Sequence, residues 1–263
     1  MRRWPFVVLA VLALAACHDR SEPEPSPEPD ELGSACEAVT FEGARFTVCT
    51  ADPGRHEIRL VVAGADGVPV REFDRLAAAV GLDASRLSFA VNAGMFEEDG
   101  SPVGLAIADG ERRHKLNRRD ASGNFHLKPN GVVFGNASGR WSVMETDAYA
   151  ASVRTPDFAT QSGPMLVIDG ELHAQFDENG TSLHIRNGVG VDEAGRAHFA
   201  ISEEAVSFGR FARLFRDRLH CPNALFLDGS VSRLWDAHGG RKDVGARVGP
   251  LLAVLDRAKA SPR

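Results

Sequence analysis

The chain has 263 residues and a formal net charge of −6, with 43% hydrophobic and 25% charged residues. This modest acidity gives no electrostatic footprint for nucleic acid. The sequence also contains no dinucleotide-binding glycine motif, P-loop, zinc-protease helix or hydrolase nucleophile elbow, and no cysteine spacing typical of a zinc site. It is long enough for one large domain with a good core, and no internal repeat is present.

The first residues indicate a lipoprotein signal peptide. Arg2 and Arg3 precede an apolar run over residues 6–16, which is too short to cross a bilayer as a helix. The small residues before Cys17 resemble the bacterial lipobox, which implies removal of residues 1–16 and attachment of acyl chains such as palmitate to Cys17. His18 at the next position favours the outer over the inner membrane, with the protein facing the periplasm. The alternative is an ordinary signal peptide cut nearby.

An acidic, proline-rich segment follows over residues 21–31. Alternating proline and acid cannot build a core, so this segment should stay extended and solvated. We therefore expect residues 17–35 to be a tether and residues 36–263 to be the folded domain.

Three cysteines remain in that domain. Cys36 and Cys49 flank a hairpin pattern over residues 39–48, and a disulfide between them is expected in an exported chain. A bridge between Cys49 and Cys221 is the alternative, and the sequence does not decide between the two pairings.

Short apolar or alternating runs separated by tight turns dominate the domain. Strands are predicted over residues 46–49, 57–63, 87–91, 103–108, 125–128, 131–134, 141–144, 165–168, 183–191, 197–202, 224–227 and 248–255. Helical spacing of apolar residues predicts helices over residues 71–80 and 203–219. Many strands with few helices in mixed order indicate an α+β fold: a single domain with mixed, largely antiparallel sheets and a few helices packed on them.

The stretch over residues 223–235 is the most informative in the chain. Residues 224–227 form an apolar run without alternation, typical of a strand buried on both faces. Asp228 follows at once, and Gly229 and Ser230 then turn the chain. A charge at the end of a buried strand costs free energy unless something pairs with it, so Asp228 is either a structural hub or part of a site.

Four segments share one design, in which a strand is followed by polar residues and glycine. They are Asn92-Ala-Gly-Met-Phe96, Gln161-Ser-Gly-Pro164, His184-Ile-Arg-Asn-Gly188 and Leu227-Asp-Gly-Ser230. Glycine lets backbone approach a ligand closely, and converging strand ends form pockets. The ordered set resembles the phosphodiester glycosidase domain family, whose lysosomal member removes N-acetylglucosamine from a phosphodiester. The resemblance covers about residues 40–256. Ala93 and the Asp-Gly-Ser-Val-Ser sequence depart from its glycine-rich pattern, which leaves the substrate open.

The resemblance and the residue chemistry together imply roles for these side chains. Asp228, Arg186 and Asn92 are the candidate catalytic residues. Arg186 suits a bidentate phosphate contact, Asp228 can act on water or on developing positive charge, and Asn92 can bind a hydroxyl or orient Asp228. The candidate substrate-binding residues are Gly94, Phe96, Gln161, Ser162, Gly163, His184, Asn187, Gly229, Ser230 and Ser232.

Structural alternatives stand beside these roles. Arg186 can instead be a buried ion-pair partner of Asp228, Asn92 can simply cap its turn, and His184 can face solvent. The basic run over residues 112–119 is typical of solvated surface, although a loop guarding an anionic substrate is an alternative. No organic cofactor is expected, and a divalent cation on the oxygens of Asp228 and Asn92 is left open.

The sequence therefore predicts a membrane-anchored hydrolase that cleaves glycosyl phosphodiester bonds, with an envelope glycan or sugar phosphate as its substrate. The alternative, from another class, is a non-catalytic envelope lipoprotein that binds a glycan or phosphoglycan in the same cleft.

Overall fold

The computed structural model describes residue 1 and residues 33–136, 139–152 and 154–258. The expected signal peptide, Cys17 and most of the tether lie outside these residues. The compact unit begins at Gly33. Among the residues that the structure describes, no helix combines the length and the apolarity needed to cross a membrane.

The described residues form three sheets. The first has seven strands, in the order β1-β2-β13-β12-β14-β10-β11, and all neighbouring strands pair antiparallel. Gly188 lies opposite Phe226, and Met165 lies opposite Leu225, so the starts of β12 and β10 both meet the end of β14. The strands are β1 (Cys36–Phe41), β2 (Ala44–Ala51), β10 (Met165–Ile168), β11 (Glu171–Leu172), β12 (Asn187–Val191), β13 (Ala197–Ser202) and β14 (Asn223–Phe226).

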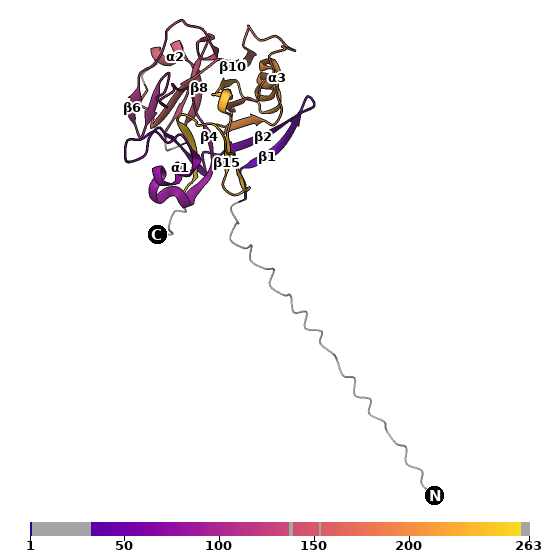
Figure 1. Ribbon diagram of the computed structural model, residues 1–263. Coiled ribbons are helices and arrows are strands. Elements are labelled where there is room, and N and C mark those ends of the chain that lie inside the picture. Colours follow the sequence, from indigo (N-terminus) through magenta and orange to yellow (C-terminus); the bar gives the residue numbers. More distant parts are fainter. Residues whose placement is uncertain (2–32, 137–138, 153, 259–263) are drawn as a thin grey trace. The chain divides into compact units, whose positions relative to one another are not determined.

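Among the described residues, the other two sheets have five strands each and are also antiparallel. Figure 1 draws the strands as arrows. In spatial order, the second contains β16 (Arg241–Lys242), β15 (Leu234–Asp236), β4 (Leu87–Asn92), β17 (Leu251–Asp256) and β3 (His56–Val61). The third contains β6 (Glu111–His114), β5 (Ala106–Ala108), β9 (Phe158–Ser162), β7 (Gly131–Gly135) and β8 (Trp141–Glu145).

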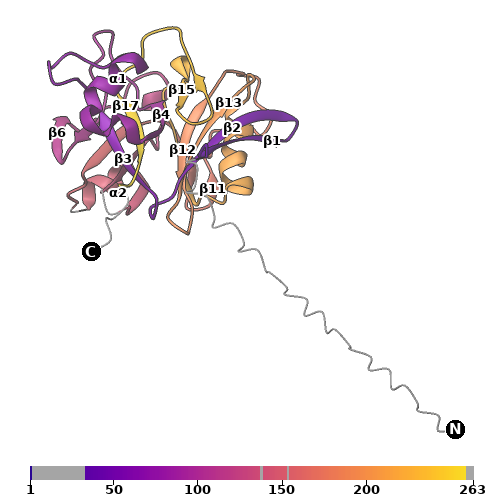
Figure 2. The ribbon, with the colours of Figure 1, turned by 90° about the horizontal axis from the view of Figure 1, so that it is seen from below.

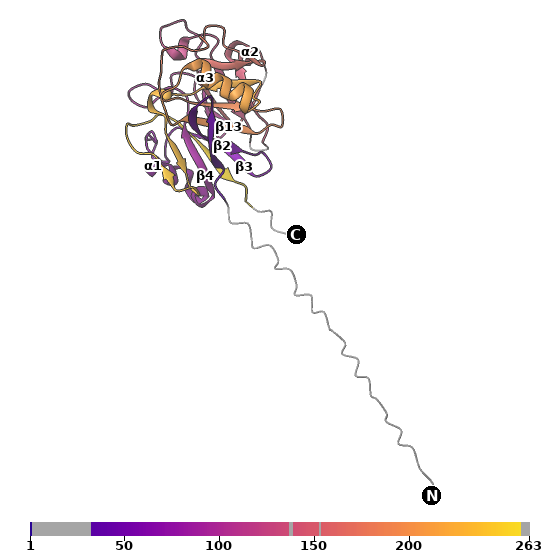
Figure 3. The same ribbon diagram turned by 90° about the vertical axis from the view of Figure 1, so that its right-hand side faces the viewer.

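The helical elements are short. They are α1 (Phe73–Val80), η1 (Gly81–Arg86), η2 (Asn124–His126), α2 (Thr146–Ala151), α3 (Phe208–Arg213), the π-helical turn η3 (Leu214–Arg218) and η4 (Gly229–Val231). α1 packs its apolar side chains against β3, β4 and β17 of the second sheet. α3 and η3 cover a face of the first sheet, as Figure 3 shows for α3 above β13 and β2.

All three sheets contribute to one central core. Phe89 from the second sheet, Phe158 from the third, and Phe199 and Leu225 from the first belong to the same buried cluster. Figure 2, in which the molecule is seen from below, labels strands of all three sheets. β4, β12, β13 and β17 are buried along their whole length, and their residues are mostly apolar or small rather than alternating, with polar exceptions such as Asn92 and His198. The α+β fold with largely antiparallel sheets is therefore confirmed.

The cysteines are arranged as the first of the two pairings predicts. Cys36 and Cys49 lie opposite each other in the β1–β2 ladder and form a disulfide. Cys221 is free and buried against β12, where Gly190 leaves room for its side chain. The alternative bridge between Cys49 and Cys221 does not form.

One predicted strand is wrong, and several predicted elements begin later than expected, among them the helix over residues 203–219. Residues 203–206 are not helical, because Val206 pairs with His184 in a β-bridge; the Oγ atom of Ser207 then accepts the N–H of Arg210 and starts the helix. The strand predicted over residues 125–128 does not form, because residues 125 and 126 belong to the 3₁₀ helix η2 and residues 127 and 128 form a bend. The strand expected over residues 183–191 begins only at Asn187, since residues 183–185 are exposed and, with the buried Arg186, belong to a loop.

Candidate active site

The four segments that the sequence singles out meet at the ends of their strands. Asn92 ends β4, and its Nδ2 atom donates to the carbonyl oxygen of Asp228 at 2.7 Å. The backbone N–H of Asp228 donates to the carbonyl oxygen of Ala93 at 3.2 Å. Asn187, the first residue of β12, donates from Nδ2 to the Oδ1 atom of Asn92 at 2.9 Å. Three of the segments are thus joined through one buried asparagine.

Asn92 has a structural place in this arrangement. Its Oδ1 atom accepts a second hydrogen bond, at 2.9 Å, from the backbone N–H of Arg233. With two bonds to Oδ1 and one from Nδ2, the amide positions the turn that carries Asp228. The same two bonds use the lone pairs that a divalent cation would need. Within the described part of the chain, no group of three or more His, Cys, Asp or Glu side chains is placed to hold a metal ion.

The side-chain amide of Gln161 uses all of its donors and acceptors in hydrogen bonds to residues that lie beside the strands of the third sheet. Its Oε1 atom accepts the N–H groups of Leu105 and Asn117 at 3.0 and 2.9 Å. Its Nε2 atom donates to the carbonyl oxygen of Asn117 at 2.7 Å and to the hydroxyl of Thr146 at 3.2 Å. The amide has no donor or acceptor left for a ligand, and it holds β9 to its neighbours.

Ser162 and Gly163, which follow Gln161, and Gly94 of the first segment are closely packed. The N–H of Gly94 donates to the Oγ1 atom of Thr160, and a Cβ atom at Gly94 would collide with the carbonyl oxygen of Gln161. The hydroxyl of Ser162 is fully buried without a hydrogen-bond partner among the described residues. A Cβ atom at Gly163 would lie 2.8 Å from the carbonyl oxygen of Phe125. Both glycines are therefore needed for close packing of β9 and its neighbours.

Arg186 is 1% exposed and is held by backbone rather than by a carboxylate. Its Nε and Nη2 atoms donate to the carbonyl oxygens of Val206 and Ser182 at 2.8 and 2.9 Å. Its guanidinium lies 3.5 Å from the centre of the Phe208 ring. Burial lowers the pKa of Arg186 to about 10. The ion pair with Asp228 that the sequence left open does not form among the described residues, because Arg186 is turned toward these loop carbonyls.

Two cavities meet at the turn that follows Asp228. The smaller, of about 260 Å³, and the larger, of about 620 Å³, share Ile185, Gly229 and Ser230. The smaller is otherwise lined by Asn124, His184, Arg186 and Phe226. The larger is otherwise lined by Val231, Ser232, Arg233, Arg241, Lys242, Asp243, Val244, Gly245 and Ala246. A ligand lying across the turn can therefore place one group on each side of it.

Asp228 is 9% exposed and lies directly before this shared turn. Its Oδ1 atom accepts the backbone N–H of Ser230 at 3.1 Å. The carboxylate forms no ion pair with any described residue. Burial raises the pKa of the Asp228 carboxyl above its ordinary value, and hydrogen bonds from Ser230 oppose this shift in part. A buried carboxylate without a counter-charge costs stability, which is typical of a functional group.

The remaining predicted residues lie near the turn or support it. The hydroxyl of Ser232 donates to the carbonyl oxygen of Gly229 at 2.9 Å, which closes the 3₁₀ turn. His184 is exposed at the rim of the smaller cavity. Phe96 is half-buried under the guanidinium of Arg71, 5.6 Å from its ring centre, and lies outside both cavities.

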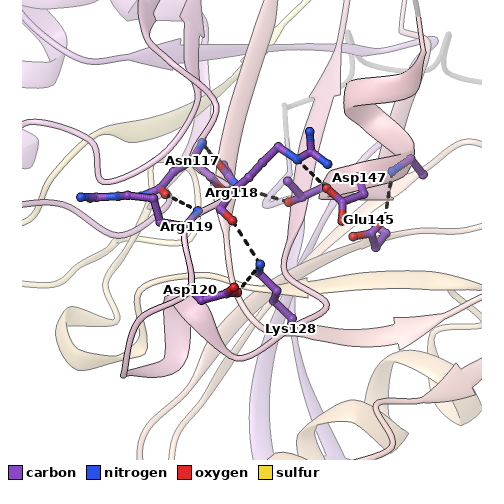
Figure 4. Close-up of polar contacts among 10 residues, drawn as sticks. Asn117, Arg118, Arg119, Asp120, Lys128, Glu145 and Asp147 are labelled. Carbon is purple, nitrogen blue, oxygen red and sulfur yellow. Dashed lines mark hydrogen bonds and ion pairs between the residues drawn. The ribbon is translucent and has the colours of Figure 1, made fainter.

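The basic run lies on the surface of the third sheet and is partly neutralised. Within the run, Arg118 pairs with Asp147 at 2.6 Å and Arg113 pairs with Glu111 at 2.9 Å. Figure 4 shows Arg118 with Asp147, and beside them Lys128, outside the run, paired with Asp120. Lys128 also donates to the carbonyl oxygen of Arg118 at 3.1 Å. These contacts fit the solvated-surface interpretation of residues 112–119. The run lines a separate cavity of about 400 Å³, which includes none of the residues of the shared turn.

Sequence reasoning missed Arg233. This arginine is 7% exposed and lines the larger cavity, and its signal was present: a lone cation between Ser232 and Leu234 in an otherwise small and apolar stretch.

Substitution of Gly229 tests whether the turn itself is required. A Cβ atom there would lie 2.5 Å from the Cζ atom of the Phe226 ring, so Gly229→Ala should displace the turn and the carboxylate before it. We expect a loss of about 1–3 kcal/mol in the free energy of unfolding, measured in urea. We expect ligand affinity or turnover to fall by a larger fraction than the free energy of unfolding does. Gly33→Ala, where a Cβ atom meets nothing within 4 Å, is the control. Equal behaviour of the two variants would contradict a fixed turn.

Comparison with known proteins places the chain among related sequences. The model of the phosphodiester glycosidase family matches residues 85–251, a range that contains all four segments. The uncharacterized protein YigE of Escherichia coli strain K12 is 32% identical over 186 residues, which are 71% of this chain and 72% of that protein.

Two solved structures share the fold. A hypothetical protein from Synechocystis aligns with a TM-score of 0.55 and 16% identity, over 84% of this chain and 61% of that chain. The catalytic domain of zebrafish N-acetylglucosamine-1-phosphodiester alpha-N-acetylglucosaminidase, auto-inhibited by its pro-peptide, aligns with a TM-score of 0.54 and 15% identity, over 84% of this chain and 82% of that chain. At these identities the similarity shows the fold alone.

Proposed function

Because this chain belongs to the phosphodiester glycosidase family, we propose that it hydrolyses glycosyl phosphodiester bonds, with Asp228 as the general base. The observation that carries the proposal is the position of Asp228: a buried carboxylate without a counter-charge, at a turn that two cavities share. Each cavity contains a buried arginine without a carboxylate partner among the described residues, Arg186 in one and Arg233 in the other. A carboxylate next to cationic cavities suits a substrate with an anomeric carbon bonded to phosphate.

The chemistry follows from the substrate. A water oxygen bonds to the anomeric carbon while the bond from that carbon to the phosphate oxygen breaks. The electron pair leaves with the phosphate, which departs as a phosphate monoester and needs little help from an acid because it is weakly basic. Asp228 takes the proton of the attacking water and then returns it to solvent. A carboxyl group with a raised pKa is a stronger base once ionised, which favours this role near neutral pH.

The test is an assay on a defined pair of substrates. A benzyl phosphodiester of N-acetylglucosamine 1-phosphate and a neutral aryl N-acetylglucosaminide are incubated with the protein, and free sugar and phosphate monoester are measured by NMR. Equal amounts of the two products from the diester, with wild type but not with folded Asp228→Asn, support the proposal. Saturable binding without release from a panel of sugar phosphodiesters would support the non-catalytic, glycan-binding role instead.

We also propose that the protein is held on the periplasmic side of a membrane, preferably the outer one, by acyl chains on Cys17. The support is the sequence alone: the apolar run, the small residues before Cys17 and the acidic tether. In bacterial cells fed an alkyne analogue of palmitate, wild type should be labelled and recovered with outer-membrane fractions. Cys17→Ser should remain unlabelled, and labelling of this variant would contradict the anchor. Cys221→Ala, which keeps the lipobox, is the control.

A further inference from the structure

Arg233 is a buried cation whose side chain is not used by the fold. Its backbone N–H is fixed by the Oδ1 atom of Asn92, immediately before β15 begins at Leu234. Its side chain lines the larger cavity, and its Nη2 atom is fully enclosed without a hydrogen-bond partner. Within the described residues the guanidinium forms no ion pair and no hydrogen bond. An enclosed cation with unused donors costs free energy, and a ligand that pairs with it recovers that cost.

The other buried arginines show what a structural role looks like. Arg213 forms two hydrogen bonds of 2.7 Å with the carboxylate of Glu42. Arg186 donates from Nε and Nη2 to backbone carbonyls and stacks on Phe208. Both guanidinium groups are committed to the fold. The guanidinium of Arg233 is not, and Arg233 is therefore a better candidate than Arg186 for binding an anion.

The other charges of the cavity are already paired, which leaves Arg233 as the cation for an anion. Arg241 pairs with Glu203 and Asp243, and Lys242 pairs with Asp74. Asp243 also accepts the backbone N–H of Leu234. Gly245 lies against the guanidinium, and a Cβ atom there would be 2.8 Å from Nη2. The absence of a side chain at Gly245 thus gives Arg233 its present position on the wall of the cavity.

We propose that Arg233 binds the phosphate group of the substrate. The phosphate and the group esterified to it then occupy the larger cavity, and the sugar occupies the smaller cavity beside Asn124 and His184. The anomeric carbon between them lies at the turn that follows Asp228. This assignment rests on the proposed glycosyl phosphodiester substrate, and it moves the phosphate contact from Arg186, which the sequence favoured, to Arg233.

Binding of anions tests the assignment without any turnover. Inorganic phosphate and N-acetylglucosamine 1-phosphate are titrated into the full chain by calorimetry. Arg233→Gln is expected to weaken binding of both probes by about 10- to 100-fold, in line with the loss of a charged hydrogen bond. Arg75→Gln, which removes an exposed arginine paired with Asp66, has the same charge change and should bind both as wild type does. Asn124→Ala should weaken only the sugar phosphate.

Two further variants distinguish loss of the phosphate contact from unfolding or distortion of the protein. Arg233→Lys keeps the charge but not the forked donors, and should recover part of the affinity. Gly245→Ala keeps Arg233 but displaces its guanidinium, and should weaken phosphate binding. Each variant is compared with wild type by circular dichroism and urea unfolding. Wild-type affinity of folded Arg233→Gln for inorganic phosphate would overturn the assignment. So would a loss of phosphate affinity in Arg186→Lys that Arg233→Gln does not show.

Kinetics then separate this assignment from the proposed function. On the phosphodiester, Arg233→Gln should raise KM more than it lowers kcat, while the rate on a neutral aryl glycoside changes little. If wild type releases sugar and Arg233→Gln retains its kcat/KM, the assignment fails and the function stands. If anions bind through Arg233 but wild type releases no sugar from any phosphodiester, the function fails and the binding site stands.

Discussion

Asp228→Asn should abolish turnover of a glycosyl phosphodiester while making the folded protein more stable at neutral pH. Asparagine has the same shape and keeps an oxygen that can accept the N–H of Ser230, so the turn is retained. It cannot take a proton from water, and loss of a general base costs about 100- to 10,000-fold in rate. The measurements are kcat on the phosphodiester and the urea midpoint of unfolding, both at pH 7.

The gain in stability follows from the raised pKa. Because burial raises the pKa of the Asp228 carboxyl in the fold, the native state binds more protons than the unfolded chain just above the ordinary pKa of aspartate. The free energy of unfolding therefore falls as pH rises through that window. Above the pKa of Asp228 in the folded protein, the carboxyl is fully ionised and the whole loss of stability is present. Asparagine does not titrate, so the variant lacks this contribution and gains most at neutral pH.

An exposed aspartate provides the control with the opposite sign. Hydrogen bonds from Val68 and Arg75 lower the pKa of the Asp66 carboxyl, so its contribution to stability is present above the ordinary pKa and is lost in acid. Asp66→Asn should leave turnover unchanged and should not stabilise the protein. A folded Asp228→Asn variant with wild-type kcat would remove Asp228 from the mechanism. If the free energy of unfolding of Asp228→Asn varied with pH as that of wild type does, the ionised carboxylate of Asp228 would not be a source of instability.

The sequence predicted the backbone of the site better than its side-chain contacts. The apolar run before Asp228 predicts a buried strand, and β14 covers all but its last residue. Glycines after strands predicted converging strand ends, and hydrogen bonds now join Asn92, Asp228 and Asn187. These features depend on local pattern, which a single sequence records.

Side-chain partners depend on loops whose paths the local pattern does not record. Arg186 is held by carbonyl oxygens of Ser182 and Val206, and the sequence predicted that Val206 lies in a helix. The bridge between Val206 and His184 removes that stretch from the helix and turns its carbonyl toward Arg186. The amide of Gln161 is likewise saturated by Leu105, Asn117 and Thr146, which lie beside the strands of the third sheet and are distant in sequence. In the sequence Arg233 is only a lone cation in a small and apolar stretch, and its lack of side-chain partners, which makes it a candidate ligand, is visible only in three dimensions.

Asn92→Ala should cause the largest loss of stability among single changes at the site. The substitution removes the acceptor of the Asn187 amide and of the Arg233 N–H, and the donor to the Asp228 carbonyl. Each buried polar group left without a partner costs about 1–3 kcal/mol, so we expect a loss of about 3 kcal/mol or more in the free energy of unfolding. Urea unfolding measures it, and turnover should fall with the displaced turn even where the variant is fully folded.

The control is an asparagine at the other end of β14. Asn223 exchanges hydrogen bonds with Asp169 at the partly exposed start of that strand, where water can replace them, so Asn223→Ala should cost about 1 kcal/mol or less. The double variant Asn92→Ala with Asn187→Ala should lose less than the sum of the two single losses, because both changes remove the same hydrogen bond. Additive losses, or an unfolding midpoint of Asn92→Ala equal to that of wild type, would show that the turn holds Asp228 without this asparagine.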